Sequence, residues 1–215
     1  MSVKNAPTDT THREAGGVMS DKLRDADGEP LPLVTILNIK GLDDALSALQ
    51  HVDDKAKVRR YRVWCARQVL HLMTDPRLLA ALDVAERYAD GQVTDDDLSA
   101  AWIAAYDASS VAVMPAERAA ARAAASAASS NVATDAAWDA AWAAASDATW
   151  VTARAAGFSE ERAARASAAW ASAWVASSDV ELVAASDAAW VAARAAQEAQ
   201  FRIMFGDATI QALEV

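Results

Sequence analysis

The chain has 215 residues, 53% of them hydrophobic, and a formal net charge of −10. This length allows one domain with a substantial core, and the acidic charge argues against general binding to a nucleic-acid backbone, which needs a positive surface. A single cysteine, Cys65, excludes an intrachain disulfide and is typical of a reducing, cytoplasmic compartment.

The N-terminal residues 1–30 are polar and show no apolar period, so we predict a disordered tail. They also lack the apolar segment of a signal peptide. In "PLPLVTILNIKG" (30–41), Pro30 and Pro32 oppose a helix and the β-branched residues favour an extended piece. We expect residues 31–215 to form a single all-α domain, with an N-terminal helical part (31–110) and an Ala/Trp-rich helical part (111–206).

Helix boundaries are marked by capping residues. Asp75 before Pro76 is a typical start, Thr94 with Asp97 resembles a capping box, and Gly157 is placed like the residue after a helix end. The pattern predicts seven or eight helices, stacked as hairpins in a bundle or an α-solenoid. They are expected at residues 42–52, 55–74, 76–89, 95–110, 115–129, 133–156, 160–177 and 179–205.

The second half of the chain contains a repeated segment. "ASDATWVTARAA" (145–156) recurs as "ASDAAWVAARAA" (185–196), with only two positions changed. The spacing matches the length of a helix hairpin, which favours structural repetition. Drift in a low-complexity coding sequence is the alternative.

Tryptophans stand at intervals in these alanine-rich helices, and two interpretations remain open. Alanine lets helices approach closely, and a large ring fills the gaps that remain, which makes Trp a core residue. Alternatively, Trp and Arg at the core boundary form a face for a protein partner, because these residue types dominate interface energetics. The candidate partner-binding residues, which share helix faces at spacings of three, four or seven, are Asp147, Trp150, Arg154, Asp187, Trp190, Arg194, Trp138 and Trp142.

No motif for catalysis, a cofactor or a metal stands out. His12, His51 and His71 are far apart, and neither a Walker A, a G-x-S-x-G nor a C-x-x-C spacing occurs. We therefore predict a protein that is not an enzyme and needs no cofactor or metal. Cys65 is expected to be a small buried hydrophobe.

Basic residues crowd one side of the helix predicted at 55–67. These residues could bind nucleic acid. The overall acidity of the chain instead favours basic side chains that face solvent or pair with neighbouring aspartates. Those aspartates are Asp43, Asp44, Asp53 and Asp54. A membrane partner is not expected, because the longest uncharged Ala/Trp/Ser run has 13 residues and a span needs about 20.

Three stretches together resemble the Imm-5-like immunity proteins, which are alanine-rich bacterial proteins. They are "TILNIKGLDDALSAL", "RYRVWCARQVLHLMTDPRLLAALDVAERYADGQVTDDDLSAAW" and the closing "EAQFRIMF". The resemblance covers roughly residues 34–205, and 36–91 is its most specific part. It implies an all-α protein that acts as the antidote to a polymorphic toxin, and it transfers no catalytic residue.

The leading hypothesis is a non-enzymatic, cytoplasmic protein-binding module. As an immunity protein it would neutralise a partner, such as a basic toxin, by steric occlusion, with an acidic rim guiding the encounter. The alternative is a structural or self-assembling helical protein, such as a phage virion or scaffold component, which would form homo-oligomers.

Overall fold

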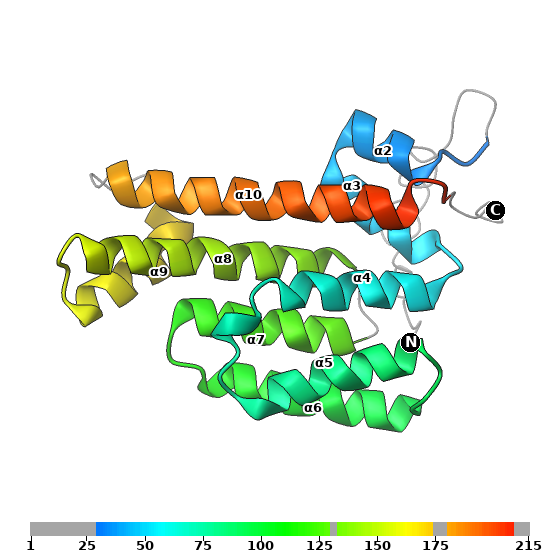
Figure 1. The fold of residues 1–215 in the computed structure, drawn as a ribbon, viewed down its shortest axis with the longest axis horizontal. Helices are drawn as coiled ribbons and strands as arrows, with labels where there is room; N and C mark the ends of the chain where they lie inside the picture. The colour runs from blue at the N-terminus through cyan, green and yellow to red at the C-terminus, as the bar shows by residue number, and fades with distance from the viewer. Residues whose placement is uncertain (1–28, 130–132, 174–179, 209–215) are drawn as a thin grey trace, which may run out of the picture. The chain divides into compact units, whose positions relative to one another are not determined.

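The computed structural model describes residues 29–129, 133–173 and 180–208, and over these ranges the chain is all-α, as predicted (Figure 1). The described residues form nine α-helices and two short 3-10 turns. They are α2 (Leu33–Lys40), α3 (Leu42–Ala48), η1 (Leu49–His51), α4 (Lys55–Arg67), η2 (Leu70–Leu72), α5 (Pro76–Ala89), α6 (Asp95–Val111), α7 (Pro115–Ala128), α8 (Ala133–Ala155), α9 (Glu160–Ala173) and α10 (Val180–Phe205).

The predicted extended piece at 30–41 is wrong, because most of it is the helix α2. Pro32 stands directly before the helix, where a missing backbone N–H costs nothing, and its carbonyl accepts from the amide of Ile36. Leu33, Ile36 and Leu37 are buried at helical spacing, so burial of this face outweighs the β-branched composition. Gly41, with φ of 91°, separates α2 from α3.

Local capping chemistry is confirmed at three predicted boundaries. The Asp75 carboxylate accepts from the amide of Arg77 at 2.9 Å. The Thr94 hydroxyl accepts from the amide of Asp97, whose carboxylate accepts in return from the amide of Thr94. Gly157 has φ of 82° and follows α8.

The helix predicted at 55–74 ends early, at Arg67. The chain leaves the helical conformation at Val69 and passes through η2, and both Val69 and Met73 bury their side chains in this turn. The predicted tail falls largely on residues 1–28, and the predicted helix end at 174–177 also lies outside the described residues.

The chain packs as two compact units, one holding the residues up to Asp53 and from Asp207 on, the other spanning Asp54–Gly206. In the smaller unit α2 packs on α3, and the amide of Leu33 donates to the carbonyl of Ala208 at 3.0 Å. The sequence boundary drawn at 110 lies inside the larger unit, where α6 packs on α7.

In the larger unit, consecutive helices from α4 to α9 pack against each other, and α8 also contacts α4 and α10 (Figure 1). All nine buried residues of α7 are alanines, so this helix approaches its neighbours closely. Buried serines bridge the helices of the second half: the Ser167 hydroxyl donates to the carbonyl of Ser146 at 2.8 Å, and the Ser186 hydroxyl donates to the carbonyl of Ala145 at 3.2 Å.

An aromatic cluster joins α4 to the end of α10. Tyr61 is fully buried and lies edge-on to Phe201 and Phe205, with ring centroids 6.0 and 5.8 Å away. Its hydroxyl donates to the carbonyl of Gln197 at 3.1 Å. Cys65 lies on the same helix with no exposed surface, which confirms its predicted place in the core.

Candidate protein-binding surfaces

Three of the predicted partner-binding residues meet between α8 and α10, and we call them the tryptophan–arginine cluster. The rings of Trp138 and Trp190 are 4.9 Å apart in an edge-to-face arrangement. The guanidinium of Arg194 lies 5.9 Å from the first ring and 6.0 Å from the second, within the range of cation–π attraction. Trp138 keeps 43% of its surface exposed, so the cluster lies at the edge of the core.

The second predicted set, Asp147, Trp150 and Arg154, is engaged within the fold. Trp150 packs on a small core that includes Leu182. Arg154 donates to the carbonyl of Phe158 at 2.6 Å, where α8 ends. One carboxylate oxygen of Asp147 lies 3.6 Å from Nε2 of His71. Contact of these residues with a partner stays a prediction.

The predicted residues do not form a single patch. Trp138 and Trp150 are twelve positions apart on α8, which is about 18 Å along a helix axis. Trp142 on α8 and Asp187 on α10 are each half-buried. A partner that touched all eight residues would therefore have to cover most of the length of α8.

Three apolar side chains that were not among the predicted residues are exposed together on α6, and we call them the α6 stripe: Trp102, Ile103 and Tyr106. These side chains are 39%, 51% and 57% exposed, and the two aromatic rings lie 5.9 Å apart. Helix α6 carries four aspartates and neither lysine nor arginine, so acidic groups accompany the stripe. Large exposed apolar patches are where proteins contact partners, which makes the α6 stripe a candidate interaction site.

The orientation of α6 explains why the stripe was missed. Its buried residues are Leu98 and the small residues Ala105, Ala108 and Ser109. In most amphipathic helices the large apolar residues face the core, but here α7 offers an alanine surface, and small residues pack closely against it. The large side chains are left on the outer face.

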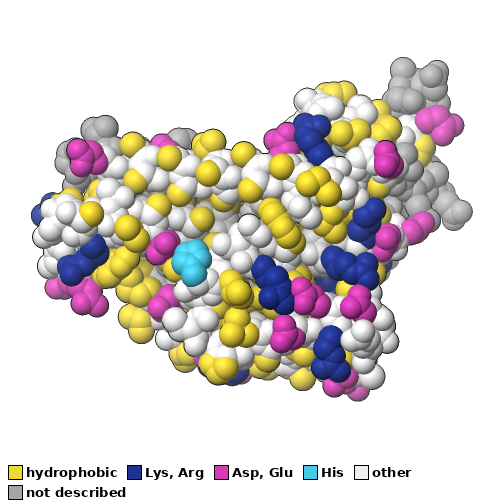
Figure 2. All heavy atoms as spheres, viewed as in Figure 1, with side chains coloured by type: hydrophobic (Ala, Val, Ile, Leu, Met, Phe, Trp, Pro, Cys, Tyr) yellow, Lys and Arg dark blue, Asp and Glu magenta, His cyan; other side chains and the backbone are white. Residues whose placement is uncertain are grey.

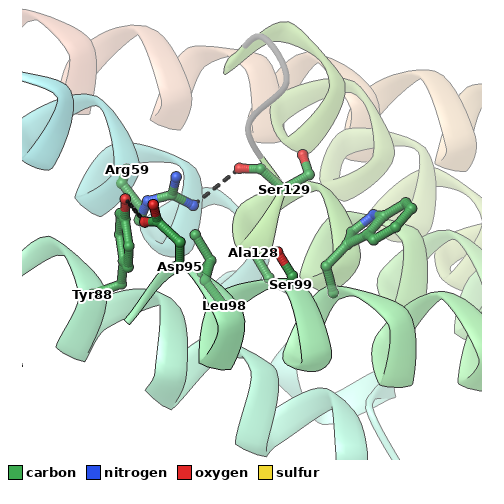
Figure 3. Close-up of a pocket in the computed structure, with 8 residues that line it drawn as sticks. Arg59, Tyr88, Asp95, Leu98, Ser99, Ala128 and Ser129 are labelled. Carbon is green, nitrogen blue, oxygen red and sulfur yellow. Dashed lines mark hydrogen bonds between the residues drawn. The ribbon is translucent and has the colours of Figure 1, made fainter. Parts of the chain in front are cut away.

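A pocket of about 470 Å³ adjoins the stripe and shares Trp102 with it. Arg59 donates from Nη1 to the carbonyls of Ala127 and Ser129, each at 3.0 Å, and its guanidinium lies 4.8 Å from the Tyr88 ring (Figure 3). The Tyr88 hydroxyl donates to Asp95 at 2.6 Å. The lining residues are Arg59, Tyr88, Asp95, Leu98, Ser99, Trp102, Ala128 and Ser129.

The electrostatics of the pocket follow from these contacts. Partial burial lowers the pKa of Arg59, while Tyr88 and Asp95 oppose that shift. The hydrogen bond to the Asp95 carboxylate raises the pKa of Tyr88. The pocket therefore holds a charged arginine and a neutral phenol at neutral pH.

Two of the basic residues of α4 form ion pairs with acidic residues of α5 or directly after it. Arg60 forms an ion pair with Asp90 at 2.7 Å, and Arg67 forms one with Glu86 at 2.7 Å. Figure 2 shows dark-blue and magenta side chains alternating over α4 and α5. Arg62, one of the basic residues of the helix predicted at 55–67, is buried and only 3% exposed. The partners in these two ion pairs are Asp90 and Glu86, which differ from the aspartates named from the sequence.

Comparison of the chain with protein-family models, with curated proteins and with solved structures finds no match. The described residues include no group of three or more His, Cys, Asp or Glu side chains placed to hold a metal ion. Among the described helices, none is long and apolar enough to cross a membrane.

Proposed function

We propose that this chain is a non-enzymatic protein-binding module that neutralises a basic protein partner by covering its functional surface. The α6 stripe is the observation that carries the proposal, because it presents two aromatic rings and an isoleucine to solvent. Truncation of a central aromatic residue in an interface typically weakens binding by about 2 kcal/mol or more.

Charge supports a basic partner. The chain has a net charge of −10, and α6 itself contributes four carboxylates without a balancing cation in the helix. An apolar centre with an acidic rim would attract a basic surface and raise the association rate. A nucleic acid would be repelled by the same charges.

The resemblance to the Imm-5-like immunity proteins supplies the biological role in this proposal. An antidote of that kind acts in the cytoplasm of the producing cell and blocks its toxin sterically, which requires no catalytic group. The tryptophan–arginine cluster offers a second contact region for the same partner.

Self-assembly through the α6 stripe is less compatible with the charge pattern. Two copies that met stripe to stripe would bring the aspartates of one α6 toward those of the other, and like charges in an interface oppose association. Sedimentation of the purified chain tests this alternative, because a structural or scaffold protein would form large assemblies.

The direct experiment is affinity capture from lysate of the source cells with the wild type and the Ile103→Ser/Tyr106→Ser double variant. Val151→Ser/Val191→Ser is the matched control, because these residues are 56% and 64% exposed on other helices. We expect one basic protein to follow the wild type and the control, and its recovery to fall about thirtyfold with the stripe variant. The purified partner should then lose its activity when the wild-type chain is added in equimolar amount.

Two results would overturn the proposal. One is the recovery of only the chain itself, in large assemblies. The other is a partner that binds the folded stripe variant as well as the wild type. A parallel Trp138→Ala/Arg194→Ala variant reports separately on the tryptophan–arginine cluster.

A further inference from the structure

We propose that the pocket beside the α6 stripe receives a cationic side chain, arginine or lysine, projecting from the protein partner. The identity of the partner rests on the proposed function, whereas the chemistry of the pocket can be tested without it. The pocket and the stripe share Trp102, so a segment lying on the stripe can reach the pocket.

The shape of the pocket fits a long side chain with an apolar stem. Asp95 and Trp102 line it from positions seven residues apart on α6, a separation of about 10 Å along a helix. Leu98 and Ala128 line the space as apolar groups. Aliphatic stems of arginine and lysine bury readily against such groups while their charged ends stay hydrated or paired.

Acceptors for the charged end are present. The Asp95 carboxylate accepts one hydrogen bond, from Tyr88, and a carboxylate has about four acceptor positions, so capacity remains for an incoming donor. The Ser99 hydroxyl also lines the pocket. The half-exposed Trp102 ring adds a face that attracts a cation.

Arg59 lines the same pocket, and its charge is already opposed within the fold. It donates to two carbonyls at the C-terminal end of α7, which is the negative end of that helix dipole, and it lies over Tyr88 near Asp95. Asp96 and Asp97 follow Asp95 in the first turn of α6 and add negative potential. A cation is therefore favoured over an anion in this pocket.

The test uses N-acetyl-arginine N-methylamide as the probe and follows it by NMR of the ¹⁵N-labelled full-length chain. The citrulline counterpart is the uncharged control ligand of nearly the same shape. The Trp102 indole N–H signal, assigned with Trp102→Phe, reports on the pocket. We expect the arginine probe to bind about fivefold more tightly than the citrulline probe, as for an exposed charge pair worth about 1 kcal/mol.

A matched pair of variants isolates the pocket carboxylate. Asp95→Asn and Asp96→Asn remove the same charge from adjacent positions, but only the first residue lines the pocket. We expect Asp95→Asn to weaken the arginine probe about fivefold and Asp96→Asn to change its affinity less than about twofold. Ser99→Phe, at an exposed position, should fill the pocket and abolish the Trp102 shift.

Equal binding of the arginine and citrulline probes, or equal effects of the two aspartate variants, would overturn the inference. A larger Trp102 shift with N-acetyl-glutamate N-methylamide than with the arginine probe would also overturn it. That result would mean that the pocket binds a carboxylate through Arg59. Ile103→Ser, which removes a stripe side chain that does not line the pocket, should leave the arginine titration unchanged. Failure of the pocket is thereby distinguishable from failure of the α6 stripe to hold a partner.

Discussion

Trp138 and Trp190 lie edge to face, with ring centroids 4.9 Å apart, and come from helices that run beside each other. The side-chain amide of Gln197 donates to the carbonyl of Ala137 at 2.7 Å, and Ser186 reaches Ala145, so α8 and α10 run antiparallel. The two rings therefore join α8 to α10, where Trp190 of the second repeat copy meets a tryptophan that precedes the first copy.

The ring pair should stabilise the fold beyond the area that each ring buries. We expect a double-mutant cycle of Trp138→Ala and Trp190→Ala to give a coupling of about 1 kcal/mol in the free energy of unfolding, the usual value for aromatic pairs. Urea unfolding followed by circular dichroism measures it. Additivity within about 0.3 kcal/mol would show that each ring contributes only by its own burial.

Arg62 should be important for stability because it holds the end of α7. It is 3% exposed, and its Nη2 donates to the carbonyl of Ser126 and to the hydroxyl of Ser129. Within the described residues its Nε has no hydrogen-bond partner, and burial lowers its pKa. Arg62→Ala removes both bonds and leaves a cavity, so we expect a loss of about 3 kcal/mol.

Arg62→Met is the informative comparison, because it fills the same space and carries no charge to desolvate. Replacement of a buried charge by a hydrophobic group of similar volume is often close to neutral. We expect this variant to lose less than half of what Arg62→Ala loses in the same unfolding assay. An equal loss for Met and Ala would mean that the hydrogen bonds, which both variants remove, matter more than the filled space.

Local chemistry explains which parts of the fold the sequence could predict. Asp75, Thr94 and Gly157 act on backbone groups within three residues of themselves, so their effect can be deduced from neighbours in the chain. The α2 prediction failed because prolines that stand before a helix were taken to oppose it. The buried period of Leu33, Ile36 and Leu37 was the available signal.

The candidate surfaces depend on packing between distant parts of the chain, which could not be predicted from local sequence patterns. The α6 stripe is exposed because α6 turns alanines toward neighbouring helices, and an alanine-rich sequence does not show which of its faces is inside. The pocket combines Arg59 of α4, Tyr88 of α5, Asp95 of α6 and Ser129 after α7. The pairing of Trp138 with Trp190 likewise required the antiparallel placement of two helices.

The capping box of α6 should make stability depend on acidity. Hydrogen bonds from the amide and hydroxyl of Thr94 lower the pKa of Asp97 below its ordinary value of 3.8. A lowered pKa in the folded state gives stability above that ordinary value, and this stability is lost as pH falls through the folded-state pKa. Asp97→Asn should therefore destabilise the chain at about pH 7 and lose that effect as pH falls below 3.8 and through the lowered folded-state pKa.

Urea unfolding of the wild type and Asp97→Asn across this acid range gives the comparison. Asp96→Asn is the control, because its carboxylate lies outside the capping box. A stability difference between the wild type and Asp97→Asn that instead stayed constant with pH would contradict the prediction. It would mean that the charge of Asp97 does not contribute and that the two side chains differ only in how well they accept the hydrogen bonds.

Burial should keep the thiol of Cys65 protonated and unreactive. Loss of hydration on burial raises its pKa from 9.0 to about 12, and the contact with Tyr61 only partly offsets this. A pKa raised in the folded state gives stability below pH 9.0 that is lost as pH rises toward about 12. The stability difference between the wild type and Cys65→Ala should change in that alkaline window, even though other groups titrate in both proteins.

Iodoacetamide should modify the native thiol only at the rate of unfolding, so rapid labelling of folded protein at neutral pH would show that Cys65 is accessible without unfolding.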